Sequence, residues 1–197
     1  QFEQYSILHI LNHIAQTRSK ISRNDQKLKD DDSDDTEERR DQGYTRPAVL
    51  VLLPTRHCCY DFIKSMDSVE GKTSEHWDRF ETEYGQPPAI EEDADEHRER
   101  VLQQKSADWK DLFGDERNKD DDFRIGVQWK NGQVKLYSDF FKSDIIVASP
   151  LALKMLESTD CLSSIEICLI WRADVLLQQN WDHVNDVMAQ KYPDAKM

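Results

Sequence analysis

The sequence has 197 residues, of which 39 are acidic and 26 basic, so its formal net charge at neutral pH is −13. This length favours one domain with a buried core over two full domains. Because no apolar run approaches the roughly 20 residues that span a bilayer, and because the N-terminus lacks a secretory signal pattern, we expect no membrane partner.

The acidic residues are concentrated in three polar segments. Residues 30–41 hold eight acidic and two basic side chains, residues 91–100 hold six and two, and residues 115–122 hold five and two. These segments account for the whole net charge and lack apolar periodicity, so we predict disordered acidic inserts at 29–43, 86–106 and 114–122. They are interpreted either as solvated loops or as docking segments for basic proteins. The neutral remainder leaves room for a local basic surface.

The first half of the chain predicts a helix, a strand and two further helices. Apolar residues on one helical face predict an amphipathic helix from residue 5 to about residue 21. The continuous apolar run at 48–53 predicts a strand covered on both faces. Helices are expected at 57–68 and at 75–84, where Gly85 and two prolines provide stop signals.

The second half predicts a hairpin and then alternating strands and helices. Apolar alternation at 123–129, the turn signal Asn131-Gly132 and the residues 133–137 predict a β-hairpin. Strands are expected at 144–148 and 165–171, and helices at 151–157 and about 175–191. The whole pattern predicts an α/β fold with a largely parallel sheet, helices on both faces and functional residues at the carboxyl ends of the strands.

One short motif suggests a nucleotide site. Gly71-Lys72-Thr73 matches the end of the phosphate-binding loop G-x-x-x-x-G-K-[ST]. The position of the first glycine is Met66, and no strand leads directly into the segment. We therefore interpret the match as coincidental and place it in a surface connection.

The cysteines and histidines do not form a metal-binding pattern. No C-x-x-C pair occurs, so buried reduced thiols are predicted for Cys58, Cys59, Cys161 and Cys168. His9 and His13 are four residues apart on the first helix, but no third ligand lies near them in the sequence. We expect neither a metal nor a cofactor.

Three segments at the ends of predicted strands resemble superfamily-two RNA helicases. LVLLPTRHCC at 50–59 is similar to the helicase segment P-T-R-E-L-A, and IIVASPLALKMLE at 145–157 is similar to I-V-V-A-T-P-G-R-L. ICLIWRADVLL at 167–177 stands in the place of V-L-D-E-A-D. The three segments occur in the helicase order, and this resemblance implies a RecA-like helicase domain.

The same strand ends provide a candidate RNA-binding surface. Thr55, Arg56, Ser149 and Pro150 offer hydroxyls, backbone N–H groups and one guanidinium, which suit contacts with phosphate. The alternative is that Pro54 and Pro150 only end strands and that Ser149 only caps a helix.

The resemblance also implies that the catalytic chemistry has been lost. Trp171, Arg172, Ala173 and Asp174 occupy the D-E-A-D position, where the first aspartate holds magnesium through water and the glutamate positions the attacking water. An indole ring cannot ligate magnesium, and a guanidinium cannot act as a base at neutral pH. Leu151 replaces the glycine of the T-P-G-R segment. No ATP hydrolysis is expected.

A closer resemblance covers residues 7–185. The phrases RDQGYTRPAVLVLLPTR, LYSDFFKSDIIVASPLALK and LSSIEICLIWRADVLLQQNWDHV resemble the U3 small nucleolar RNA-associated protein 25 family, also called digestive organ expansion factor. This resemblance implies a single N-terminal RecA-like pseudohelicase domain over 1–197, in a nucleolar protein of the small-subunit processome that serves pre-rRNA processing and 18S rRNA maturation. The implied partners are processome proteins and, directly or indirectly, pre-rRNA and the U3 snoRNA particle. Trp171-Arg172 departs from the Asp-Gln commonly found there in the family.

An enzyme remains the alternative hypothesis. It would be an RNA-dependent ATPase or helicase whose phosphate loop and second domain lie outside this chain. Another carboxylate would then have to replace the two residues lost at Trp171 and Arg172, and Asp174 alone is a poor substitute.

Overall fold

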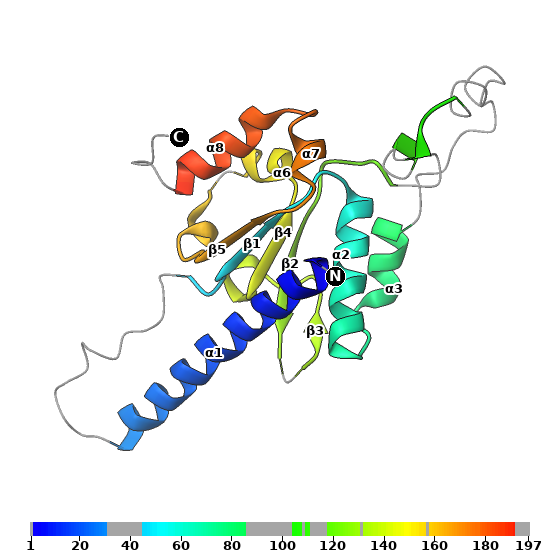
Figure 1. Ribbon diagram of the computed structural model, residues 1–197. Coiled ribbons are helices and arrows are strands. Elements are labelled where there is room, and N and C mark those ends of the chain that lie inside the picture. Colours follow the sequence, from blue (N-terminus) through cyan, green and yellow to red (C-terminus); the bar gives the residue numbers. More distant parts are fainter. Residues whose placement is uncertain are drawn as a thin grey trace.

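The computed structural model describes residues 2–30, 45–85, 104–107, 109–110, 118–130, 132–156 and 158–191. The centre of the fold is a five-stranded sheet with the order β3-β2-β4-β1-β5 (Figure 1). Its strands are β1 (Val49–Leu52), β2 (Arg124–Trp129), β3 (Val134–Lys135), β4 (Ile145–Ala148) and β5 (Ile167–Ile170). The α/β class predicted from the alternation of strands and helices is therefore confirmed.

The sheet is mixed, so the prediction of a largely parallel sheet holds for only part of it. β1 pairs in parallel with β4 on one side and with β5 on the other. β2 is antiparallel to both β4 and β3. The physical reason is the short route between β2 and β4, which leaves no room for a crossover helix, so that neighbouring strands run in opposite directions.

The predicted hairpin is confirmed. Gln128 pairs with Lys135 and Trp129 with Val134 across β2 and β3. In the turn between them the N–H of Lys130 donates to the carbonyl of Gln133 at 2.9 Å. Gly132 has a φ of +68°, a conformation that glycine adopts without strain.

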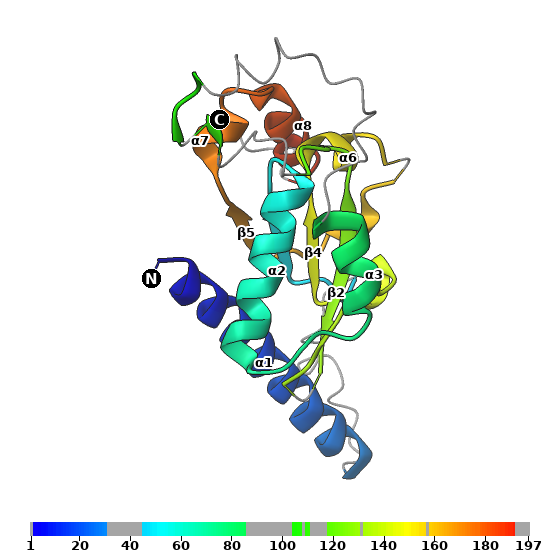
Figure 2. The same ribbon diagram turned by 90° about the vertical axis from the view of Figure 1, so that its right-hand side faces the viewer.

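Helices cover both faces of the sheet, as the alternation predicted. Alternate residues of β1 face opposite cores: Val49 and Val51 belong to the first, and Leu50 and Leu52 to the second. The first core includes residues of α1 (Phe2–Asp30), α2 (Arg56–Glu70) and α3 (Trp77–Phe80), which continues as a π-helical turn at Glu81–Gly85. The second includes residues of α6 (Pro150–Lys154) and α8 (Trp181–Lys191). Figure 2 shows α6 and α8 together, away from α1.

Two predicted helix bounds need correction. The first helix was expected to end near residue 21, but α1 extends to Asp30, and its second half reaches away from the body (Figure 1). The single helix expected at 175–191 is two helices, α7 (Ala173–Leu176) and α8. The break occurs because the side-chain oxygen of Asn180 accepts a 3.2 Å hydrogen bond from the N–H of Asp182 and so caps α8.

The prediction of disordered acidic inserts falls mostly outside the described residues. It does not hold for 118–122, because Asn118 is buried and its side-chain amide donates to the carbonyl of Glu83 at 3.1 Å. The backbone carbonyls of Asn118 and Asp120 also accept hydrogen bonds from α2. An aspartate run at a helix N-terminus satisfies free N–H groups and complements the helix dipole.

The buried carboxylate of Asp144, at the start of β4, joins four parts of the chain. Its two oxygens accept hydrogen bonds from Arg18 of α1 at 3.1 and 2.5 Å. They also accept from Arg46 at 3.2 Å and from the backbone N–H of Trp129 at 2.7 Å. Its backbone carbonyl accepts from Ala48 and Val49 at the start of β1. Asp144 thereby fixes α1 against the sheet.

In the part of the chain that the structure describes, no helix is long and apolar enough to cross a membrane.

Substituting Asp144 by alanine should destabilise the fold. The change leaves Arg18 and the N–H of Trp129 without their acceptor, which we expect to cost about 3 kcal/mol in free energy of unfolding. Urea titration followed by tryptophan fluorescence measures this. Asp25→Ala, which removes an exposed carboxylate from the same helix as Arg18, should change the value by less than about 0.5 kcal/mol. Equal effects of the two substitutions would contradict the role of Asp144.

Candidate functional site

The carboxyl ends of β1, β4 and β5 meet at one edge of the sheet. These three strands run in parallel, so the residues after them approach one another. This edge also carries the starts of α2, α6 and α7 (Figure 1). In α/β sheets this edge is the usual place for a ligand, and the sequence-predicted site residues follow these three strands.

The two hydroxyl residues of the predicted RNA surface are buried helix caps. The Thr55 hydroxyl accepts from the N–H of Cys58 at 3.3 Å and caps α2. The Ser149 hydroxyl accepts from the N–H of Ala152 at 3.0 Å and caps α6, whose first residue is the buried Pro150. Thr55 is 3% exposed and Ser149 1% exposed. The capping alternative for Ser149 is therefore what the structure shows, and an RNA contact for these residues stays a prediction.

Arg56 is held by the acidic segment at 118–122. Its Nε lies 2.9 Å from a carboxylate oxygen of Asp120, and its Nη2 donates to the carbonyl of Asp122 at 2.9 Å. The guanidinium also lies over the ring of Tyr84, 5.3 Å from its centroid. The cation predicted to meet phosphate therefore already has an anionic neighbour.

The same acidic segment closes the N-terminus of α2. The N–H of Arg56 donates to the carbonyl of Asp120 at 2.8 Å, and that of His57 donates to the carbonyl of Asn118 at 3.0 Å. Free N–H groups at a helix N-terminus are a common anion-binding site. Here the chain itself occupies them, a feature that sequence reasoning missed because the aspartate run was interpreted as loop.

A hollow of about 200 Å³ lies beside these caps. Ser149 and Pro150 line it, as predicted for the strand-end surface, but Thr55 and Arg56 do not. Its other polar lining residues were not predicted, since one continuous helix was expected over most of them. Its remaining lining residues are Pro54, Asp121, Leu151, Leu176, Gln179, Asn180 and His183.

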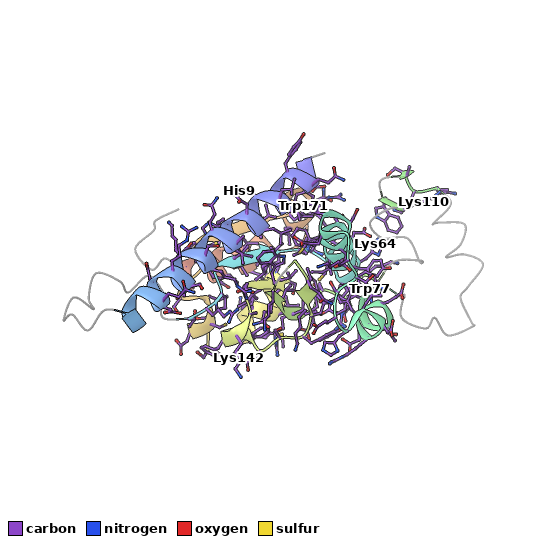
Figure 3. All side chains as sticks on the ribbon, turned by 90° about the horizontal axis from the view of Figure 1, so that it is seen from below. His9, Lys64, Trp77, Lys110, Lys142 and Trp171 are labelled. Atoms are coloured by element: carbon purple, nitrogen blue, oxygen red, sulfur yellow. The ribbon has the colours of Figure 1, made fainter. Side chains whose placement is uncertain are left out.

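Trp171, at the first D-E-A-D position, is half-buried and packs against the first core. Its ring centroid lies 6.4 Å from that of Phe62 in α2, and its backbone N–H donates to the carbonyl of Leu52 at 2.9 Å. Figure 3 shows Trp171 near α2. The position that would carry a magnesium-binding aspartate in a helicase therefore has a packing role.

Arg172 and Asp174 pair with each other. Nε and Nη2 of Arg172 lie 3.2 and 3.1 Å from the two carboxylate oxygens of Asp174, and this pairing lowers the pKa of Asp174. Arg172 adopts the left-handed conformation, with a φ of +55°, as the residue before α7; Ala173 is the first residue of that helix. Among the described residues, no group of three or more potential ligands is placed to hold a metal ion.

The Gly-Lys-Thr motif ends a helix and does not begin one. Gly71 is the C-terminal cap of α2, with a φ of +67° and its N–H donating to the carbonyl of Asp67 at 2.8 Å. Lys72 and Thr73 are exposed. A phosphate loop opens a helix, so the interpretation of this motif as a coincidence in a surface connection is confirmed.

Burial was predicted for all four cysteines, and the structure shows it for two of them. The four cysteines are free thiols, and Cys59 and Cys161 are buried, while Cys58 and Cys168 are half-buried. Burial raises the pKa of each, that of Cys168 to about 11, so the thiols stay protonated at neutral pH. On α1, the Nε2 of His13 lies 2.6 Å from a carboxylate oxygen of Glu166.

Comparison with known proteins gives one consistent family. The family model described as UTP25, NTP hydrolase-like domain, matches residues 1–194. The U3 small nucleolar RNA-associated protein 25 of Pyricularia oryzae is 41% identical over 189 residues, which cover 91% of this chain and 25% of that relative. The proteins of the same name from Schizosaccharomyces japonicus and Komagataella phaffii are 40% and 38% identical, covering 91% and 96% of this chain. The chain spans about a quarter of the length of these relatives. No solved structure matches it.

The pairing of Arg172 with Asp174 predicts a measurable titration. Arg172→Ala should raise the pKa of Asp174 towards its ordinary value, because the charged form loses its hydrogen-bond donor. The carboxylate ¹³C shift of Asp174 followed through acid pH measures this. Arg172→Lys keeps the charge but loses the bidentate geometry, so a smaller rise in the pKa of Asp174 is expected. An unchanged pKa in Arg172→Ala would show that the pair is absent in solution.

Proposed function

This chain belongs to the U3 small nucleolar RNA-associated protein 25 family, and from that premise we propose that it is a non-catalytic, helicase-like scaffold domain of the small-subunit processome. In this role the protein supports pre-rRNA processing and 18S rRNA maturation in the nucleolus. Its partners are then processome proteins, together with pre-rRNA and the U3 snoRNA particle.

The observation that carries the non-catalytic part is the occupied D-E-A-D position. Trp171 packs against Phe62, and Arg172 holds the carboxylate of Asp174. A helicase needs carboxylates at this place to hold magnesium and to orient water. Neither an indole nor a guanidinium can take those roles, so the site favours a scaffold over a phosphoryl-transfer enzyme.

We also propose that the domain is RecA-like in its finer architecture and that residues 1–197 form a single unit. The support is the parallel trio β4-β1-β5 with helices on both faces, and the three helicase-like segments that end these strands. The hairpin of β2 and β3 is then an antiparallel extension at one side of this trio.

We propose that RNA contacts the strand-end surface only when the acidic segment at 118–122 moves away from Arg56. Arg56 remains the cation best placed for phosphate, but Asp120 is already within 2.9 Å of it. Phosphate binding would therefore have to displace the acidic segment, and Thr55, Ser149 and Pro150 would contribute mainly by fixing the backbone around it. This arrangement favours RNA contact only inside an assembled particle.

The scaffold proposal predicts that purified full-length protein does not hydrolyse ATP. Wild type and Asp174→Ala should both show no turnover above a protein-free control, with or without RNA and magnesium, since the described chain offers no ligand cluster for the metal. Phosphate release measures this. RNA-stimulated turnover that Asp174→Ala abolishes would instead establish the ATPase alternative, in which the phosphate loop and second domain lie outside this chain.

The conditional contact of Arg56 predicts opposite effects of two substitutions. Asp120→Asn removes the charge that competes with phosphate for Arg56. It should increase crosslinking of full-length protein to pre-rRNA by about two- to fivefold, which is the change in affinity that the free energy of a surface ion pair corresponds to. Arg56→Gln should reduce crosslinking.

The matched control for this experiment is Asp182→Asn. It makes the same change in charge at an exposed carboxylate in α8 and should leave crosslinking unaltered. If Asp120→Asn and Arg56→Gln both crosslink like wild type, Arg56 does not contact RNA, although the scaffold role would stand.

A further inference from the structure

The half of α1 that reaches away from the body leaves a hollow between the helix and the start of the sheet (Figure 1). Its volume is about 430 Å³, against about 200 Å³ for the hollow beside the helix caps. Six of its nine lining residues lie on one face of α1, and the other three precede β1 or β4. The hollow therefore lies at the end of the sheet opposite the strand ends that resemble helicase segments.

One wall of this hollow is apolar. Ile14 is buried in the first core, and Ala48 packs against that core. Ile21, seven residues after Ile14 on the same face of α1, is half-buried and packs against neither core. The apolar stripe of α1 therefore continues beyond the part of the helix that the body covers. A ligand that covers Ile21 would remove apolar surface from water, which favours binding.

The opposite wall holds two guanidinium groups that are fixed by one buried carboxylate. The side chain of Asp144 is 5% exposed, whereas those of Arg18 and Arg46 are 25% and 44% exposed. Arg18 uses Nε and Nη2 to bind Asp144, and Arg46 uses only Nε. Nη1 of Arg18 and both Nη nitrogens of Arg46 form no hydrogen bond within the described residues. Guanidinium groups held in this way are preorganised to bind a further carboxylate or phosphate.

The remaining polar groups limit the kind of ligand that fits. The hydroxyls of Thr17 and Ser22 also line the hollow and have no hydrogen-bond partner in the part of the chain that the structure describes. The carboxylate of Asp25 lines it too, and together with Asp144 it balances the charges of the two arginines. Nucleic acids bind surfaces with an excess of positive charge. A ligand with few carboxylates and an apolar group suits this hollow better.

We propose that this hollow binds a segment of a partner protein in which an aspartate or glutamate stands beside a bulky apolar residue. The carboxylate of that segment accepts hydrogen bonds from the Nη groups of Arg46 and Arg18, and its apolar side chain covers Ile21. The proposal rests on the hollow alone and does not depend on the proposed function.

Selection of a random phage-displayed peptide library on the purified full-length protein tests this proposal. The enriched peptides should share an acidic residue beside Leu, Ile, Phe or Met. The Kd of one fluorescein-labelled enriched peptide is then measured by fluorescence anisotropy. We expect Arg46→Gln to raise it at least about tenfold and Ile21→Ala about threefold, because each removes one of the two contacts. Asp25→Asn should lower it about twofold, since it removes a repelling charge.

The matched control is Arg23→Gln, which makes the same change at an exposed residue of α1 outside the hollow and should leave the Kd unaltered. Replacing the acidic residue of the peptide by its amide should weaken binding as much as Arg46→Gln does. If Arg46→Gln does not fold, Ile21→Ala and Asp25→Asn still decide the question, because both residues lie outside the two cores.

Three results would overturn the proposal. The first is enrichment of peptides without the acidic and apolar pair, and the second is a Kd that is the same in Ile21→Ala, Arg46→Gln and Arg23→Gln. The third is a different occupant. An oligouridine of about ten nucleotides that displaces the peptide and binds more tightly would make RNA the occupant. Peptide binding that appears only after deletion of residues 31–41 would identify that acidic segment of the chain itself as the occupant.

Discussion

The buried carboxylate of Asp144 is the interaction on which the arrangement of the fold depends most. It accepts hydrogen bonds from α1, from the residues before β1 and from the end of β2, while its own backbone begins β4. A buried charge is tolerated only when it is fully paired, so these four parts must assemble together. The position of α1 follows from this, because Arg18 fixes its middle where Ile7, Ile10 and Ile14 enter the first core.

At the opposite end of the sheet, charged groups are also satisfied within the chain. Arg56 lies against Asp120, Arg172 lies against Asp174, and the acidic segment closes the start of α2. In an active helicase the corresponding places serve phosphate, magnesium and water. Here internal partners take them, and this replacement is the observation on which the proposed scaffold role rests.

The sequence predicted the elements of this fold better than their pairing. Continuous apolar runs identify β1 and β4, which are buried on both faces, and β5, which is half-buried. The turn at Gly132 identifies the hairpin. The direction of β2 relative to β4 was missed, because apolar alternation is the same in parallel and antiparallel pairs.

The candidate site was predictable in position but not in its contacts. The positions of the strand ends, including Trp171 and Arg172 after β5, follow from sequence order. The ion pair of Asp120 with Arg56 joins residues 64 positions apart. The sequence of an acidic run does not show whether it forms a solvated loop or packs on a helix. The cap at Asn180 was missed because apolar periodicity continues across it.

The most direct test of the central claim is 18S rRNA production in cells in which the native protein is replaced by a full-length variant carrying Arg172→Ala and Asp174→Ala together. The scaffold account predicts normal 18S rRNA and normal co-precipitation of U3 snoRNA, because the pair has no catalytic role. Loss of 18S rRNA from a variant that still folds and still co-precipitates U3 snoRNA would contradict the account and restore a catalytic function to this site.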